Sequence, residues 1–118
     1  MKKINVVKES EDFNKIIASK VCVKDKNLVI YYKNNNLGHY RFGITVPKKL
    51  GKAHIRNYYK RVLRNICDLN KLIYSNDKDY IIIVRKGCFE TDYLGIENSF
   101  KYLMNKIGKG MSKWKTRK

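Results

Sequence analysis

Five consecutive apolar residues, Tyr80-Ile81-Ile82-Ile83-Val84, restrict the fold of this chain more than any other segment. Most of them are β-branched, which favours an extended backbone. Successive side chains of a strand point to opposite faces of its sheet, so a strand that is apolar at every position suits a place where both faces are covered. We therefore predict a strand over 80–84 that is covered on both faces and closed by Arg85-Lys86-Gly87.

Three further strands are predicted upstream of this run. The clearest covers 40–46, where apolar residues occupy every second position, as in a sheet with one face buried. The segments 21–23 and 28–32 are also apolar and rich in β-branched residues, and the polar residues 24–27 separate them. An Asn-rich stretch over 34–38 ends in glycine and supplies a turn before the third strand.

Three helices complete the predicted order. The first covers about 11–19, because Ser10 followed by two acids is a helix start and apolar residues then recur at i, i+3 and i+4. The second follows Pro47 and a basic connection over 48–52. The order of elements is therefore α-β-β-β-α-β-α, which predicts a single-domain α/β sandwich over residues 1–118 with helices packed on one sheet.

The third helix follows a cap at Thr91 or Asp92, and a glycine at 108 is expected to end it. The residues after this glycine, 109–118, are mostly polar and basic. We expect them to form a flexible tail, because few apolar side chains are present to hold the segment to the core.

Size and composition indicate one folded domain outside the membrane. The 118 residues, 43% of them hydrophobic, are enough to bury a single core. Met1-Lys2-Lys3 leads into acidic residues rather than the apolar core of a signal peptide, and no apolar run is long enough to cross a bilayer. We therefore expect a cytoplasmic protein with no membrane partner.

The cysteines and histidines follow no disulfide or metal-ligand pattern. Cys22, Cys67 and Cys88 are widely spaced and odd in number, and neither His39 nor His54 has Cys, Asp or Glu neighbours at ligand spacing. Nucleophile motifs and phosphate-binding glycine loops are also missing from the sequence. We expect three reduced core cysteines, no metal site, no cofactor held by the protein alone, and no catalytic residue in this polypeptide.

The net charge of +17 indicates a polyanionic partner. The codon usage of an AT-rich genome would by itself raise the lysine content, but it would not remove acids from one segment. Residues 26–67 contain no Asp or Glu, although lysines and arginines recur throughout them. This distribution, more than the total charge, indicates a surface that faces phosphates.

The second helix is predicted to have two faces. At about 100° per residue, the apolar residues from Ile55 to Leu69 occupy one arc. The opposite arc carries polar residues: Arg56, Asn57, Lys60, Arg61 and Arg64. A charged arc is usually only a solvated face, but these cations have no acid at i+4 and therefore repel one another. An RNA backbone along the arc would convert this repulsion into attraction.

The segment from Arg41 to Arg64 resembles the signature of the bacterial ribonuclease P protein family. The resemblance lies in a strand that ends in Pro47-Lys48-Lys49-Leu50-Gly51-Lys52-Ala53 and in the helix that carries Arg56-Asn57-Tyr58-Tyr59-Lys60-Arg61. It extends to Asp12-Phe13 and to residues 78–86, and so covers nearly the whole chain.

Three positions depart from the family pattern. Tyr58 stands where the second arginine of an Arg-Asn-Arg triplet is usual, Lys52 replaces an asparagine, and Ile17 replaces an aromatic residue of the first helix. The first change removes a guanidinium and supplies a phenol, which can stack or form one hydrogen bond.

The resemblance implies an α/β sandwich with a left-handed β-α-β crossover, which is the ribosomal protein S5 domain 2-like fold. It also implies a subunit of a ribonucleoprotein endonuclease, a hydrolase that removes the 5′ leader of precursor tRNA. The RNA would perform the cleavage with the Mg²⁺ ions that it holds, while the protein would bind the catalytic RNA and the precursor, with no obligate protein partner.

The family motif also implies two sets of site residues. The catalytic RNA would contact the basic helix and the loop before it, through Lys48, Lys49, Lys52, Arg56, Asn57, Lys60, Arg61 and Arg64. The single-stranded leader would lie in a cleft between the first helix and the sheet, lined by Phe13, Ile17 and Tyr31. From the residues alone, these last three side chains could equally be core.

Other functions fit the size and charge. A ribosomal or ribosome-assembly protein would share both features but would give no reason for the motif. A stand-alone metal-dependent nuclease would need clustered carboxylates, which the sequence does not show. A DNA-binding module is disfavoured because nothing resembles a helix-turn-helix spacing.

Overall fold

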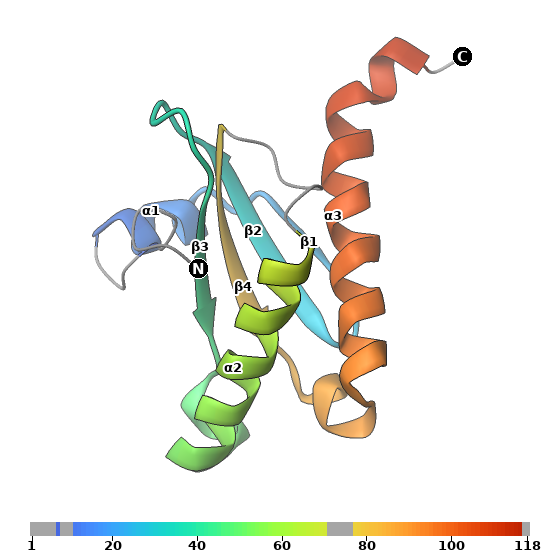
Figure 1. Cartoon of the computed structure of the whole chain (residues 1–118). Helices are drawn as coiled ribbons and strands as arrows, with labels where there is room; N and C mark the ends of the chain where they lie inside the picture. The colour runs from blue at the N-terminus through green and yellow to red at the C-terminus, as the bar shows by residue number, and fades with distance from the viewer. Residues whose placement is uncertain (1–6, 8–10, 71–76, 117–118) are drawn as a thin grey trace.

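The computed structural model describes residue 7, residues 11–70 and residues 77–116, and its elements follow the predicted order (Figure 1). The helices are α1 (Glu11–Ala18), α2 (Ala53–Leu69) and α3 (Tyr93–Thr116). The strands are β1 (Cys22–Lys24), β2 (Leu28–Asn34), β3 (Arg41–Thr45) and β4 (Lys78–Val84). Two short 3-10 turns, η2 (Lys48–Leu50) and η4 (Lys86–Glu90), precede α2 and α3. The helix start expected at Ser10 lies outside the described residues.

The four strands form one sheet in the order β1-β2-β4-β3. β4 is antiparallel to β2 and parallel to β3, so its backbone is hydrogen-bonded on both edges. Tyr80 and Ile82 belong to the cluster under α2 and α3, whereas Ile81 belongs to the cluster under α1, and all three are at most 1% exposed. The prediction that the apolar run is a strand covered on both faces is therefore confirmed.

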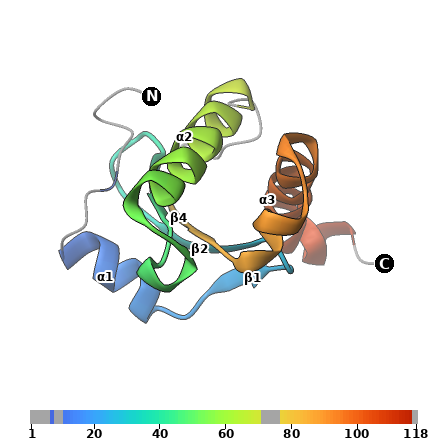
Figure 2. The ribbon, with the colours of Figure 1, turned by 90° about the horizontal axis from the view of Figure 1, so that it is seen from below.

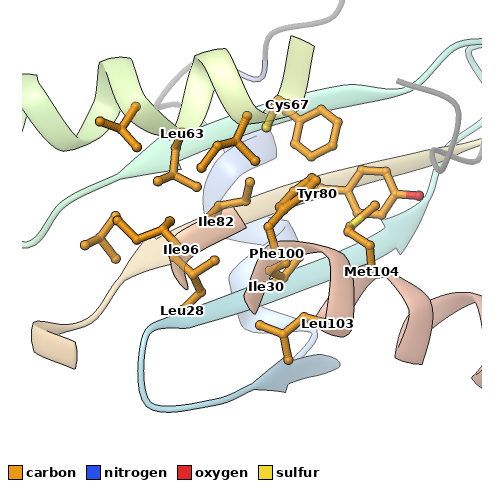
Figure 3. Packing of buried hydrophobic residues seen from close by; sticks show 14 of the residues in the cluster. Leu28, Ile30, Leu63, Cys67, Tyr80, Ile82, Ile96, Phe100, Leu103 and Met104 are labelled. Atoms are coloured by element: carbon orange, nitrogen blue, oxygen red, sulfur yellow. The ribbon is translucent and has the colours of Figure 1, made fainter. Parts of the chain in front are cut away.

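The helices cover both faces of the sheet (Figure 2). α2 and α3 lie side by side on one face and bury the main core, in which Phe42, Leu63, Ile82 and Phe100 are at most 1% exposed (Figure 3). α1 lies on the opposite face over a smaller cluster: Val7, Phe13, Ile16 and Ile81, with Ile17, Tyr31 and Ile83 against it. α1 does not cover the whole of this face, because Tyr31 and Ile83 are only partly buried there.

The connection from β3 through α2 to β4 is a left-handed crossover. β3 and β4 both run downward in Figure 1, β4 lies to the right of β3, and α2 lies in front of the sheet. The view from below places α2 on the same side as α3, in agreement (Figure 2). This hand is opposite to the general rule for parallel strands, and it confirms the expectation that came from the family resemblance.

The start of α3 was predicted correctly, and its end was not. The Asp92 carboxylate accepts a hydrogen bond from the Gly95 backbone N–H at 2.9 Å, which is the capping interaction expected there. Helical backbone continues through Gly108 to Thr116. Glycine ends a helix when it adopts the left-handed conformation, and among the described residues Gly38 is the glycine in that region. The helix therefore extends beyond its expected end at Gly108, as far as Thr116.

Two residues that were expected to be buried, Leu69 and Cys22, are not. Leu69, expected on the buried arc of α2, is 67% exposed because it is the last residue of the helix. Cys22, expected in the core, is only half-buried because β1 is the edge strand and α1 does not cover it. Cys67 and Cys88 are buried and free, as expected.

Gly43 allows α1 and Val7 to lie close to the sheet. A Cβ atom at this position would be 2.9 Å from Ile81 Cδ1, 3.1 Å from Phe13 Cε2 and 3.2 Å from the Val7 carbonyl oxygen. The Val7 backbone N–H also donates to the Phe42 carbonyl at 2.8 Å, which holds Val7 beside β3. Any side chain at 43 would push these elements apart.

We predict that Gly43→Ala lowers the free energy of unfolding by about 1–3 kcal/mol, the usual cost of overpacking a core. Urea denaturation of the purified chain would measure this change. Ile81→Val removes the nearest atom, Cδ1, and should alone cost about 0.5–1.5 kcal/mol. The double variant should lose less than the sum of the two single losses. Additive losses would show that the contact with Ile81 is not the cause.

Candidate RNA interface

The polar arc of α2 faces away from the sheet over most of its length. Asn57, Arg61 and Arg64 are exposed, and Lys60 is partly covered. No ion pair joins Lys60, Arg61 or Arg64 to a carboxylate among the described residues. We call the set Arg56, Asn57, Lys60, Arg61 and Arg64 the basic arc. Its charges are uncompensated in the free protein, so the arc is suited to bind phosphates.

Arg56 has a second role besides its charge. Its Nε donates a hydrogen bond to the Gly51 carbonyl oxygen at 3.2 Å, and the side chain is partly buried. This bond fixes the first turn of α2 to the segment before it. A substitution at Arg56 would therefore change both the charge and the position of that segment, whereas Arg61 and Arg64 carry charge without a described structural bond.

The segment 47–52, which we call the entry loop, presents three lysines to solvent. The Leu50 N–H donates to the Pro47 carbonyl at 3.0 Å and the Gly51 N–H donates to the Lys48 carbonyl at 3.3 Å, so the loop is a tight turn. Lys48, Lys49 and Lys52 are exposed on it. The first turn of α2 contains no acid and its cap makes no side-chain hydrogen bond. The positive end of the helix dipole thus adds to the lysine charges.

A groove of about 660 Å³ lies on the face of the sheet that α1 leaves uncovered. The strand register places Cys22 beside Tyr31 and Val29 beside Ile83 on its floor. The lining residues are Cys22, Lys24, Val29, Tyr31, Pro47, Lys49, Leu50, Ile83, Val84, Arg85 and Lys86. The floor is apolar and aromatic, and the exposed cations among these residues stand at its edge. Because Lys49 belongs to the entry loop, the groove and the basic arc meet there.

The three residues predicted for the leader cleft lie at different depths. Tyr31 is half-buried and lines the groove, with its ring beside the α1 cluster. Ile17 is half-buried against the same cluster. Phe13 is only 7% exposed and packs beneath α1, so little of its ring is open to a base. Tyr31 is therefore the residue of this set whose position suits stacking, while Phe13 supports α1.

The sequence reasoning did not assign Cys22, Lys24, Arg85 or Lys86 to a site. Lys24 belongs to the short edge strand, and Arg85 with Lys86 was read as the end of a strand. A signal was available, because two adjacent cations directly after a buried strand must lie at one end of the sheet. The groove itself could not be found without the strand order, which places β1 and β2 beside β4.

Arg41 belongs to the acid-free stretch but does not face solvent freely. Its Nε donates to Asp79 Oδ1 at 2.8 Å and its Nη2 donates to Asp79 Oδ2 at 2.6 Å. The Asn35 amide donates to the same carboxylate at 2.7 Å. This two-bond pair ties β3 to β4 where they run parallel. Arg41 is therefore a structural residue and not part of the phosphate-binding set.

Three of the described acids, Asp25, Asp79 and Asp92, have structural partners. Asp25 accepts hydrogen bonds from the Asn27 and Leu28 backbone N–H groups at 2.8 and 2.9 Å, Asp79 is paired with Arg41, and Asp92 caps α3. Within the described residues, no three or more His, Cys, Asp and Glu side chains come close enough together to hold a metal ion. The carboxylate oxygens needed for a Mg²⁺ site on the protein do not converge there.

The buried cysteine at 88 is not an activated nucleophile. Burial raises the pKa of the Cys88 thiol to about 11, and the thiol donates to the Asn27 carbonyl oxygen at 3.1 Å. A thiol with this pKa is protonated at neutral pH.

In the part of the chain that is described, no helix is both long enough and apolar enough to span a membrane. Together, the basic arc, the entry loop and the groove are chemically suited to bind a polyanion whose bases can stack on an aromatic ring.

Comparisons with known proteins agree with this geometry. The family model for ribonuclease P matches residues 1–108. The ribonuclease P protein component of Streptococcus agalactiae is 37% identical over 108 residues, covering 92% of this chain and 98% of the relative. That of Mycoplasma capricolum is 39% identical over 108 residues, covering 91% and 99%.

Solved structures give the same result. The ribonuclease P protein of Staphylococcus aureus superposes with a TM-score of 0.77 at 34% identity, covering 89% of this chain and 95% of that one. The protein from Thermotoga maritima gives a TM-score of 0.78 at 28% identity, covering 85% and 94%. With its α/β fold, its left-handed crossover and these relatives, the chain belongs to the bacterial ribonuclease P protein family and is the protein subunit of a ribonucleoprotein endoribonuclease in tRNA 5′ processing.

Proposed function

We propose that the basic arc and the entry loop bind the catalytic RNA, and that the groove holds the 5′ leader of precursor tRNA. The observation that carries this proposal is the position of Lys49, which belongs to the entry loop and also lines the groove. One loop therefore joins two cationic surfaces on different sides of the molecule. An RNA on the arc and a single strand in the groove would meet at this loop.

The groove suits a single strand because it combines stacking surface with charge. Tyr31 supplies an aromatic ring, Val29 and Ile83 supply apolar floor, and cations stand along the edge. Proteins that bind single-stranded nucleic acid use this combination, with cations along the backbone and rings against the bases. The bases of a paired region are already stacked inside their helix, so a groove of this kind favours an unpaired leader, whose bases are free to stack on Tyr31.

The proposed division of labour leaves bond cleavage to the RNA. Asp25 is held by backbone amides and Asp79 by Arg41, and within the described residues no cluster of His, Cys, Asp and Glu side chains could hold Mg²⁺. We propose that the RNA holds most of the Mg²⁺ that the holoenzyme requires. The protein would contribute affinity, discrimination and phosphate screening, in the cytoplasm and without an obligate protein partner.

Reconstitution tests this proposal as a whole. Precursor tRNA cleavage at low Mg²⁺ should be faster with the cognate catalytic RNA and this protein than with that RNA alone, because the protein cations screen phosphates that otherwise repel each other. A single-turnover assay would measure the rate. Preferential binding to ribosomal RNA would favour a ribosomal function, and cleavage by the protein without RNA would favour an independent nuclease.

The basic arc predicts a salt-dependent affinity. If about five to eight cations contact phosphates, the logarithm of affinity for the catalytic RNA should fall against the logarithm of salt concentration with a slope of roughly −4 to −7. Arg61→Ala should weaken binding and reduce the slope by about one. The free energy of unfolding should change by no more than about 0.5 kcal/mol, since Arg61 is exposed.

Lys101 supplies the matched control for Arg61, because it is an exposed cation on α3 outside both proposed surfaces. Lys101→Ala should leave the affinity and the slope nearly unchanged. An equal loss in both variants would mean that net charge alone drives binding. A wild-type slope near −1 would mean that the basic arc is not the RNA site.

The groove predicts a preference for precursor over mature tRNA, because only the precursor carries a leader. Tyr31→Leu removes one stacking surface and should reduce this preference by about five-fold to a hundred-fold while mature tRNA affinity stays constant. Tyr31→Phe keeps the ring and should behave like wild type. Affinities of the holoenzyme for both tRNAs would measure the change. A uniform loss for both ligands would assign Tyr31 to packing.

Cys22 gives a second measurement at the same site. It is half-buried in the groove, whereas Cys67 and Cys88 are buried, so a thiol-alkylating reagent should label Cys22 first. A precursor tRNA bound in the holoenzyme should slow this labelling, and mature tRNA should not. Equal labelling rates with both ligands would place the leader elsewhere.

A further inference from the structure

Three aromatic rings form a rigid surface at the junction of α2 and η4. The Tyr58 and Tyr59 ring centroids lie 5.0 Å apart with an interplanar angle of 84°, and those of Tyr59 and Phe89 lie 5.1 Å apart at 50°. Tyr58 is 53% exposed and Phe89 is 41% exposed. We call these three residues the aromatic ledge. It lies outside the groove, whose lining contains none of the three.

Contacts with the main core and with the sheet hold the aromatic ledge in place. Tyr59 packs against the main core, and burial raises the pKa of its phenol. η4, which carries Phe89, is fixed to the sheet because the Cys88 thiol and the Arg85 backbone N–H both donate to the Asn27 carbonyl oxygen, at 3.1 and 2.9 Å. The two outer rings are therefore exposed and preorganised, so ligand binding would lose little conformational entropy in ordering them.

Positive charge lies on one side of the aromatic ledge and negative charge on the other. On α2, Tyr58 lies one turn from His54 and Arg61, both exposed, and it borders the basic arc. On the other side, Phe89 is followed by Glu90 and then Asp92, which are exposed acids. A phosphate backbone would be attracted to the α2 side and repelled from the α3 side. A base that projects from a backbone on the arc would thus reach the ledge while its phosphate stays on α2.

We propose that the aromatic ledge stacks an unpaired base of the catalytic RNA whose phosphates contact the basic arc. This inference rests on the RNA-binding role proposed for the arc. Unpaired RNA bases stack on aromatic rings and also on guanidinium planes. Tyr58 occupies the position where the family pattern has an arginine, so one planar stacking group stands in place of another. Stacking here depends on ring surface and not on charge.

Stacking and phosphate contact respond differently to salt, and this difference provides the test. Tyr58→Leu, and Tyr58→Leu combined with Phe89→Leu, should weaken binding of the cognate catalytic RNA by about five-fold to a hundred-fold, the effect of losing one stacked base. The slope of affinity against salt should stay at the wild-type value, because no phosphate contact is removed. Tyr58→Phe keeps the ring and should bind like wild type. Filter binding over a range of salt concentrations would measure both quantities.

Tyr102 is a matched control, since it is a 55% exposed tyrosine on α3. Tyr102→Leu should bind the RNA normally, and thermal unfolding should show that every variant remains folded. Normal binding by folded Tyr58→Leu would overturn the ledge proposal. If Arg61→Ala also binds normally, the arc proposal fails as well, so the two failures are distinguishable. Self-association of the free protein that Tyr58→Leu abolishes, seen by sedimentation, would instead assign the ledge to a second copy of the chain.

Discussion

β4 is hydrogen-bonded on both edges and covered on both faces, and both candidate RNA surfaces depend on this. Its Tyr80 and Ile82 side chains anchor α2 and α3, while Ile81 anchors α1. An edge strand could not join two cores in this way, because half of its backbone groups would need other partners. The basic arc lies outside one core, and the groove lies beside the other. A disturbance of β4 would therefore move both surfaces together.

The left-handed crossover determines which face of the sheet remains available. A right-handed path between β3 and β4 would place α2 on the face that carries Tyr31 and Ile83, where the groove lies. The observed hand places α2 beside α3 instead, so α1 is the one described helix on the other face (Figure 2). The entry loop must then turn from the end of β3 toward α2 at the edge of the groove. Its lysines thereby reach both surfaces.

Local patterns predicted the elements, and contacts between distant segments determined the site. The 80–84 strand and the Asp92 cap follow from neighbouring residues, so the sequence was sufficient for both. Arg41 lies in the acid-free stretch 26–67, but its carboxylate partner Asp79 is 38 positions away. Phe13 was assigned to a cleft, although Gly43 lets it pack against the sheet. In each case the deciding contact joins residues far apart in the sequence, and no periodicity along the chain reveals it.

The acids and the cations of the chain have different tasks, and this links stability to RNA binding. Asp25, Asp79 and Asp92 each complete a turn, an ion pair or a cap, so they are unavailable to neutralise the basic arc. The arc cations consequently repel one another in the free protein, which opposes the compact state. Bound RNA removes this repulsion and also stabilises the fold by mass action, since the unfolded chain does not assemble the arc. The charges that lower the stability of the free subunit are thus also the charges through which RNA binding stabilises its fold.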